Sequence, residues 1–311
     1  MVKIAVAGGA DGLGRAIVDA IRNDGKHEII ILSRRPHEDP AVNVVDYSSI
    51  DDLRSLFERE KIHTVVSTIG AYTEAHHRSQ MNMIEAADLS PSVKRFIPSE
   101  FGFHIKPEIA HRSVSFPFKL ETLKRLEKSN LEFTLIHTGV FLDYLVYPRV
   151  PSYLQCQTVW VHLGLNIAAL PGDGNMPVAF THSEDVGKLV ALILDVPRWE
   201  QRYYAVANRL TLNELVKIAE DVKGSPIAVS YDSREKLERG ECTLLPGPTE
   251  SEWKHDRFDA HDQYMKYMVD LCSLVVDGLA DLDGETAITS IFPGFKPLTV
   301  RDAVKKWVQA G

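Results

Sequence analysis

Cysteine is scarce in this chain of 311 residues, and the three that occur (Cys156, Cys242 and Cys272) form no C-x-x-C pair. We therefore expect no metal site built on cysteine, and the small odd number favours a reducing compartment. No run approaches the 18 apolar residues of a membrane-spanning helix. No basic segment with a long apolar run opens the sequence as in a signal peptide. We expect a cytoplasmic protein without membrane contact.

The chain also lacks an excess of positive charge, with a formal net charge of -8. General nucleic-acid binders usually carry a basic balance, so no nucleic-acid partner is expected. There is no G-x-S-x-G motif, which leaves α/β-hydrolase chemistry without support. The pair His76 and His77 has no acidic or cysteine partners at metal-ligand spacing, so no metal is expected. The length suits one large domain or two modest ones, as a monomer or homodimer.

Strand-like and helix-like segments alternate over the first 140 residues. The expected strands are Val2–Ala7, Glu28–Leu32, Thr64–Ile69, Lys94–Pro98 and Phe133–Thr138. The expected helices are Gly12–Asn23, Ser49–Glu58, Gln80–Ala87 and Phe118–Lys128. Further on, helices are expected at Ser183–Leu194 and Asp262–Leu279, and Thr211-Leu212-Asn213-Glu214 predicts a capping box that opens another helix. Apolar strands separated by helices predict an α/β fold, a Rossmann-like doubly wound parallel sheet. We assign residues 1–150 to an NAD(P)-binding domain and 151–311 to a smaller substrate-binding lobe, intertwined with the first.

A glycine-rich turn follows the first strand and opens the first helix. Glycines let the backbone approach a pyrophosphate, and a helix N-terminus offers unpaired N–H groups and a partial positive charge. This strand-turn-helix context favours nucleotide binding over an empty turn. The expected cofactor contacts in the turn are Gly8, Gly9, Gly12, Leu13 and Gly14.

Arginines follow the second strand, where an acidic residue would bind the ribose 2′-hydroxyl of NAD. Guanidinium groups pair with a 2′-phosphate instead, so Ser33, Arg34 and Arg35 predict NADPH/NADP as the cofactor. The alternative is a solvated surface pair of arginines. Asp46 and Tyr47 are expected beside the adenine.

Further candidates follow the next strands, because the carboxyl ends of parallel strands form the ligand crevice of such sheets. Expected cofactor contacts there are Thr68, Ile69, Gly70, Ser99, Glu100 and Phe101. For Ser99 the partner is the nicotinamide ribose or the substrate. For Glu100 a structural role in fixing the loop is an equal alternative.

Lys119, at the start of a helix, is the candidate catalytic residue and a further cofactor contact. A lysine at a helix start against an apolar pocket can serve as an acid or base when desolvation favours its neutral form. The alternative is a surface lysine on an amphipathic helix. The residues expected to contact substrate are Phe101, His137, Phe141, Tyr144 and Tyr147.

These motifs together resemble the atypical short-chain dehydrogenases of the NmrA-like and isoflavone reductase-like group, most closely the fungal members. The matching segments are Gly8–Gly14, Ser67–Gly70, Arg95–Gly102, Phe116-x-x-Lys119 with Glu127 and Thr134, Gly172–Asn175 with Glu184–Val186, and Asn208–Glu214. They run from residue 2 to about 225. Ala10-Asp11 stands where the family usually has Thr-Gly, and Leu123 where its reductases often have Arg, beside Lys124.

The resemblance implies a Rossmann-like domain, bound NADPH and a C-terminal substrate lobe. It also implies hydride transfer to phenylpropanoid-type or related aromatic substrates, with acid/base chemistry at the lysine matching Lys119. We therefore expect an NADPH-dependent reductase of a small aromatic or enone-like metabolite. Two alternatives stay open: a non-catalytic NADP-sensing regulator, and a redox-neutral isomerase on the same fold.

Overall fold

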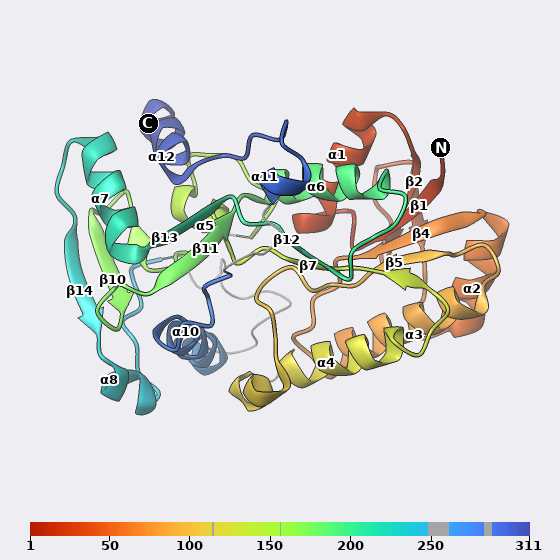
Figure 1. The fold of residues 1–311 in the computed structure, drawn as a ribbon, viewed down its shortest axis with the longest axis horizontal. Helices are drawn as coiled ribbons and strands as arrows, with labels where there is room; N and C mark the ends of the chain where they lie inside the picture. Colours follow the sequence, from red (N-terminus) through yellow and green to blue (C-terminus); the bar gives the residue numbers. More distant parts are fainter. Residues whose placement is uncertain (114, 156, 248–260, 283–287) are drawn as a thin grey trace. The chain divides into compact units, whose positions relative to one another are not determined.

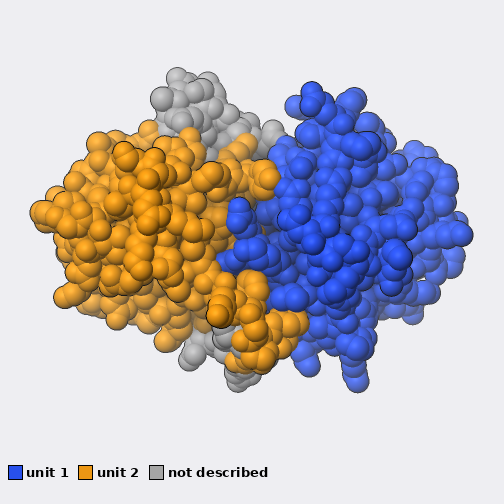
Figure 2. All heavy atoms as spheres, turned by 90° about the horizontal axis from the view of Figure 1, so that it is seen from above, with its two compact units in different colours: residues 1–101, 105–136, 184–203 blue, residues 102–104, 137–183, 204–311 orange. Residues whose placement is uncertain are grey.

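A computed structural model of the chain describes residues 1–113, 115–155, 157–247, 261–282 and 288–311 (Figure 1). Cys156 lies outside the described residues. The chain forms two compact units, each assembled from separate segments and coloured in Figure 2. Unit 1 comprises residues 1–101, 105–136 and 184–203, and unit 2 comprises residues 102–104, 137–183 and 204–311.

Unit 1 is built on a six-stranded sheet in the order β3-β2-β1-β4-β5-β6, in which every neighbouring pair is parallel. Its strands are β1 (Lys3–Ala7), β2 (Glu28–Ser33), β3 (Val42–Val44), β4 (Ile62–Ser67), β5 (Arg95–Ile97) and β6 (Glu132–Phe133). The four residues Ile4–Ala7 are fully buried, which explains why this strand reads as continuously apolar. The predicted doubly wound parallel sheet is confirmed.

Helices cover both faces of this sheet. They are α1 (Gly12–Asp24), α2 (Ile50–Arg59), α3 (Glu74–Leu89), α4 (Ser115–Leu126) and α6 (Ser183–Leu194), with a 3-10 turn η1 (Pro107–Arg112) before α4. Figure 1 shows α1 and α6 on one face and the other three helices on the opposite face. On the latter face, Phe57 of α2, Met83 of α3 and Leu126 of α4 join one apolar core with Ala5 of the central strand.

The predicted fifth strand, Phe133–Thr138, is wrong as one continuous element. β6 ends at Phe133, and β7 (Leu135–His137) pairs with β12 (Arg202–Tyr204) in a separate two-stranded sheet. The reason is a change of hydrogen-bond partner: the Thr134 N–H still donates to Phe96 of β5, whereas the Leu135 N–H donates to the Gln201 carbonyl. The predicted strand Thr64–Ile69 also ends earlier, at Ser67.

Arg95 attaches the segment after α6 to unit 1. Its guanidinium pairs with Glu132 at 2.7 Å and donates to the carbonyls of Val196 at 3.0 Å and Pro197 at 2.6 Å. The same group lies 4.7 Å from the ring centre of Trp199. An arginine that donates to several acceptors at once is well suited to hold an irregular segment against a strand.

Unit 2 contains two three-stranded sheets, ordered β14-β10-β9 and β13-β11-β8. Its strands are β8 (Val140–Phe141), β9 (Val161–His162), β10 (Ile167–Pro171), β11 (Pro177–Thr181), β13 (Asn208–Thr211) and β14 (Ala228–Asp232). Its helices are α5 (Asp143–Val146), α7 (Leu212–Lys223), α8 (Arg234–Glu238), α10 (His261–Val276), α11 (Ile288–Ile291) and α12 (Val300–Gln309). The expected helix Asp262–Leu279 thus ends at Val276.

The predicted capping box at the start of α7 is confirmed. The Thr211 side chain accepts the Glu214 N–H, and the Glu214 carboxylate accepts the Thr211 N–H. Residues 137–150, which the sequence analysis assigns to the first domain, belong to unit 2, where β8 pairs in parallel with β11. The functional assignment of the two parts of the chain stays a prediction.

Gly187 is the point at which α6 passes closest to α1, because a Cβ there would lie 2.5 Å from the Ala16 carbonyl oxygen. We expect Gly187→Ala to destabilise the protein by about 1–2 kcal/mol net, since overpacking against main-chain atoms lies at the upper end of a cost of about 1–3 kcal/mol. That cost outweighs the gain of about 1 kcal/mol in helix propensity. Urea unfolding measures the difference.

The matched control for this substitution is Gly294→Ala, where a Cβ would meet nothing within 4 Å. We expect the control to change stability by less than about 0.5 kcal/mol. A Gly187→Ala protein as stable as wild type would show that the two helices do not approach this closely.

Candidate active site

The parallel sheet of unit 1 brings four predicted motif segments to one edge. The glycine-rich turn follows β1, Ser33–Arg35 ends and follows β2, Thr68–Gly70 follows β4, and Ser99–Phe101 follows β5. These strands are mutually parallel, so their carboxyl ends lie together. This edge is where open α/β sheets bind ligands.

The glycine-rich turn packs directly against Thr68. The Thr68 hydroxyl donates to the Ala7 carbonyl oxygen at 2.8 Å. A Cβ on Gly8, which has φ +76°, would lie 2.8 Å from that hydroxyl, and one on Gly14 would overlap the Gly8 carbonyl. Side chains are therefore excluded at both positions, and only glycine lets the backbone turn here.

The first turn of α1 keeps its N–H groups open to a ligand. Asp11 is the N-cap residue, yet its side chain makes no capping hydrogen bond, and the first turn contains no acidic residue. Gly12 adopts φ +55°, and a Cβ there would meet nothing within 4 Å. Unpaired N–H groups with the helix dipole behind them suit an anion such as a pyrophosphate.

The end of β2 presents two exposed arginines. Arg34 and Arg35 are both exposed, and the Arg35 N–H donates to the Ser33 hydroxyl at 3.1 Å. Tyr47, in contrast, is buried, and its hydroxyl donates to the Leu32 carbonyl at 2.9 Å. Burial raises the pKa of the Tyr47 phenol well above its ordinary value. Asp46 is exposed and accepts the Ser48 N–H at 2.8 Å.

Lys119 and Glu100 form a nearly buried pair. The Lys119 Nζ donates to the Glu100 main-chain carbonyl at 3.2 Å and lies 3.7 Å from the Glu100 Oε2 atom. The lysine side chain is 14% exposed, and Glu100 is 4% exposed. Burial raises the pKa of the Glu100 carboxyl above its ordinary value, and the positive charge of Lys119 opposes that effect.

Gln80 of α3 connects the segments that carry this pair. Its Oε1 atom accepts the Ser99 N–H at 2.9 Å, and its Nε2 atom donates to Thr122 of α4 at 3.2 Å. A second link lies one turn away, where His77 stacks on Phe118 with ring centres 4.6 Å apart. Lys119 thus projects from a helix that is held on both sides of it.

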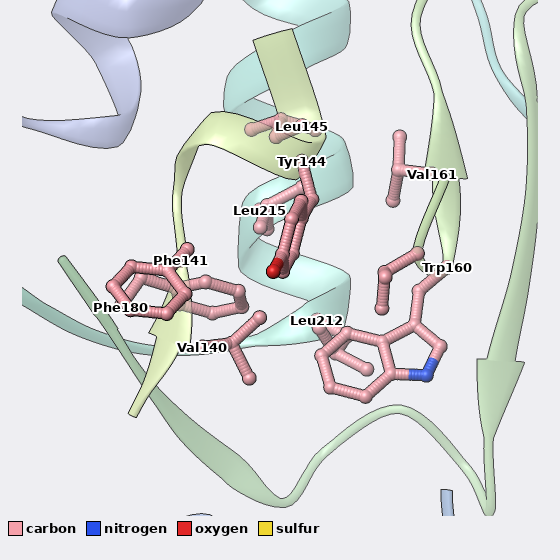
Figure 3. A pocket seen from close by; sticks show the side chains of 10 residues that line it. Val140, Phe141, Tyr144, Leu145, Trp160, Val161, Phe180, Leu212 and Leu215 are labelled. Atoms are coloured by element: carbon pink, nitrogen blue, oxygen red, sulfur yellow. The ribbon is translucent and has the colours of Figure 1, made fainter. Parts of the chain in front are cut away.

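Two of the predicted substrate residues meet in unit 2. Phe141 and Tyr144 contact each other edge to face, with ring centres 6.1 Å apart. Both line an apolar pocket (Figure 3). Its lining is completed by Val140, Leu145, Val159, Trp160, Val161, Phe180, Leu212 and Leu215. The open space between these side chains is about 10 Å³, room for the centre of about one water molecule.

The other two predicted substrate residues of unit 2 do not line this pocket. His137 is 1% exposed and stacks on His104 with ring centres 5.0 Å apart. Tyr204 completes this cluster through a hydrogen bond of 2.9 Å between its hydroxyl and the His104 Nδ1 atom. Tyr147 is 38% exposed. Phe101 is the last residue of the first segment of unit 1 and is half-buried.

Three residues at or beside these features were not singled out from the sequence. Gln80 carries a weak signal, because it is a polar residue on the helix face that also bears Met83, Ile84 and Ala87. Trp160 and Tyr204 carry no sequence signal, since the residues that they contact lie far away in the sequence.

Across the ranges given above, no three His, Cys, Asp or Glu side chains gather so as to hold a metal ion. Within the same ranges, no helix has both the length and the apolar character needed to cross a bilayer.

The parallel sheet, its strand order and the glycine-rich turn after β1 define a Rossmann-type α/β protein. A model of the NmrA-like family matches residues 2–255, and the chain belongs to this family. The resemblance inferred from the motifs is confirmed, and the match continues beyond residue 225.

The chain is 37% identical over 230 residues to oxidoreductase BOA1 of Botryotinia fuckeliana, covering 72% of this chain and 77% of that protein. It is 32% identical over 330 residues to oxidoreductase swnN of Metarhizium robertsii, covering 95% and 97%. Among solved structures, the leucoanthocyanidin reductase–NADPH complex from Vitis vinifera superimposes with a TM-score of 0.74 at 18% identity, covering 99% of both chains.

The bridge made by Gln80 gives a stability prediction. We expect Gln80→Leu to lower the free energy of unfolding by about 1–3 kcal/mol, because the Ser99 N–H loses its acceptor. The size of the side chain is nearly kept, so loss of packing contributes little. Urea unfolding followed by tryptophan fluorescence measures it.

Ser79→Ala is the control on the same helix, since the exposed Ser79 hydroxyl donates only to the Ala75 carbonyl. It should cost less than about 0.5 kcal/mol. If both variants unfold at the same urea concentration as wild type, Gln80 does not connect the two segments.

Proposed function

We propose that this protein is an NADPH-dependent oxidoreductase that reduces a small aromatic or enone-like metabolite, with Lys119 as the acid/base group. The observation that carries the proposal is the Lys119 Nζ atom, held by the Glu100 carbonyl at 3.2 Å on a side chain only 14% exposed. A fixed, nearly desolvated ammonium is suited to proton transfer. A surface lysine on an amphipathic helix would be mobile and hydrated.

The cofactor assignment is supported by the glycine-rich turn and by the comparisons. The absence of room for side chains at Gly8 and Gly14 and the open N–H groups of α1 fit a pyrophosphate. The exposed guanidinium groups of Arg34 and Arg35 fit a 2′-phosphate. The leucoanthocyanidin reductase of the same fold is a complex with NADPH. NADPH, when bound, supplies a hydride.

The chain's own residues bind the cofactor and the substrate and transfer the proton. Backbone N–H groups of the turn and of α1 hold the phosphates, and Ser99 binds the nicotinamide ribose or the substrate. Lys119 gives a proton to the substrate oxygen as the neighbouring carbon is reduced, which prevents an oxyanion from accumulating. Contact of the substrate with Phe101, His137, Phe141, Tyr144 and Tyr147 stays a prediction.

A non-catalytic NADP sensor is the second candidate, and the small pocket of unit 2 favours it. About 10 Å³ between Phe141, Tyr144 and Trp160 does not admit an aromatic ring without movement of those side chains. Two measurements distinguish the reductase from the sensor. The protein is first titrated with NADPH and NADH by intrinsic fluorescence, and it is then given a panel of aromatic ketones and enones. NADPH binding with turnover supports the reductase, and binding without any turnover supports the sensor.

Replacing both arginines after β2 tests the 2′-phosphate assignment. We expect Arg34→Ala with Arg35→Ala to weaken NADPH binding by about 10- to 100-fold and to leave NADH binding unchanged, since a hydrogen bond to a charged group contributes about 1.5–3 kcal/mol. Arg54→Ala removes an exposed arginine that pairs with Glu58, and it is the charge control. Equal loss of affinity for both nucleotides, or no loss, would contradict the assignment.

Lys119→Met tests the acid/base role. We expect kcat to fall by about 10²- to 10⁴-fold, the usual contribution of a positioned acid or base, with the Kd for NADPH kept within a factor of a few. Lys128→Met, at an exposed lysine just after α4, is the control and should turn over normally. Turnover by Lys119→Met at the wild-type rate would remove Lys119 from the chemistry.

A further inference from the structure

Glu100 has a carboxyl group that is more deeply buried than its bonding explains. The residue is 4% exposed, and its Oε1 atom is buried without a hydrogen-bond partner among the described residues. Its Oε2 atom lies 3.7 Å from the Lys119 Nζ atom. A buried carboxyl group with an unsatisfied oxygen is costly, so stability alone does not explain this residue.

Two cationic side chains face this carboxyl group from different elements. Lys119 approaches from α4, and the positive charge of Arg202 acts on it from β12. Both favour the ionised form of Glu100, whereas its burial favours the neutral form. The charge of Glu100 and the charge of Lys119 are therefore linked, because each stabilises the other in a poorly hydrated place.

We propose that Glu100 is the positioning residue of Lys119, a role that rests on the proposed function of Lys119 as the proton donor. Its main-chain carbonyl orients the Nζ atom, and its carboxylate places the opposite charge 3.7 Å from that atom. After Lys119 has given a proton from Nζ to the substrate oxygen, a proton from solvent restores the ammonium. Glu100 itself forms and breaks no covalent bond to the substrate.

This role makes a prediction that does not depend on turnover. Acetic anhydride acylates only a neutral amine, so the rate of acetylation of Lys119 reports how much of it is uncharged. We compare the rate at pH 8 with the rate at pH 10 in the protein without cofactor, and mass spectrometry of peptides measures both. Dividing the rate at pH 8 by the rate at pH 10 cancels the effect of each lysine's accessibility. The exposed Lys128 is the internal standard.

We expect Glu100→Gln to raise the pH 8 to pH 10 ratio for Lys119 about fivefold, because the ammonium loses the opposite charge that lies 3.7 Å from it. Glu100→Asp keeps a charge and should stay within about threefold of wild type. The Lys128 ratio should not change. If Glu100 only supports the loop, neither variant alters the Lys119 ratio, and the proposal is overturned.

A second test measures kcat and the Kd for NADPH in the same variants. Glu100→Gln should lower kcat at pH 8 with the Kd for NADPH retained, and Glu100→Asp should restore part of the rate. Should the Gln variant fail to fold, the kcat of the Asp variant decides, because its shorter side chain moves the carboxylate away from the Lys119 Nζ atom, and a kcat equal to wild type overturns the proposal. A changed ratio in Glu100→Gln with full activity in Lys119→Met refutes the proposed function but leaves the pairing established.

Discussion

The close approach of β1, α1 and the end of β4 is the constraint on which the rest of unit 1 depends. The Thr68 hydroxyl reaches the Ala7 carbonyl, and in doing so it fills the space that a side chain on Gly8 or Gly14 would need. Helix α1 can therefore start immediately after the central strand, with its N–H groups at the carboxyl edge of the sheet. A bulkier residue at position 14 would push the helix away and displace the backbone donors that a helix N-terminus offers to an anion.

A closed ring of contacts fixes the lysine next to that edge. Gln80 hydrogen-bonds to the Ser99 N–H and to the Thr122 hydroxyl. Thr122 lies one turn along α4 from Lys119, and the Lys119 Nζ atom donates to the carbonyl of Glu100, the residue after Ser99. A polar group in such a ring costs free energy when it is buried without a partner and costs little when it is hydrogen-bonded. The ring therefore tolerates little deformation. Preorganisation of this kind is what a proton donor requires, because an ill-positioned ammonium loses most of its effect.

The features that sequence reasoning predicted well are those encoded locally. The glycine-rich turn, the capping box at Thr211 and the helix Ser183–Leu194 each depend on residues within a few positions of one another. The break after Phe133 was missed because the Leu135 N–H turns to Gln201, 66 residues along the chain. The contact of Tyr204 with His104 is hidden for the same reason, and the bridge at Gln80 is marked only weakly, by a polar residue on an apolar helix face.

The two units differ in how ready they are to receive a ligand, and this difference bears on substrate choice. The turn of unit 1 is closely packed, because the Thr68 hydroxyl fills the space beside Gly8 and Gly14. The pocket of unit 2 is closed by the edge-to-face contact of Phe141 and Tyr144. A substrate ring that enters must separate them, at a cost of about 0.5–1.5 kcal/mol for the lost aromatic contact, and it recovers that cost by stacking on the same rings. An aromatic ligand in this pocket would replace the interaction that opening removes, whereas an aliphatic one of equal size would not.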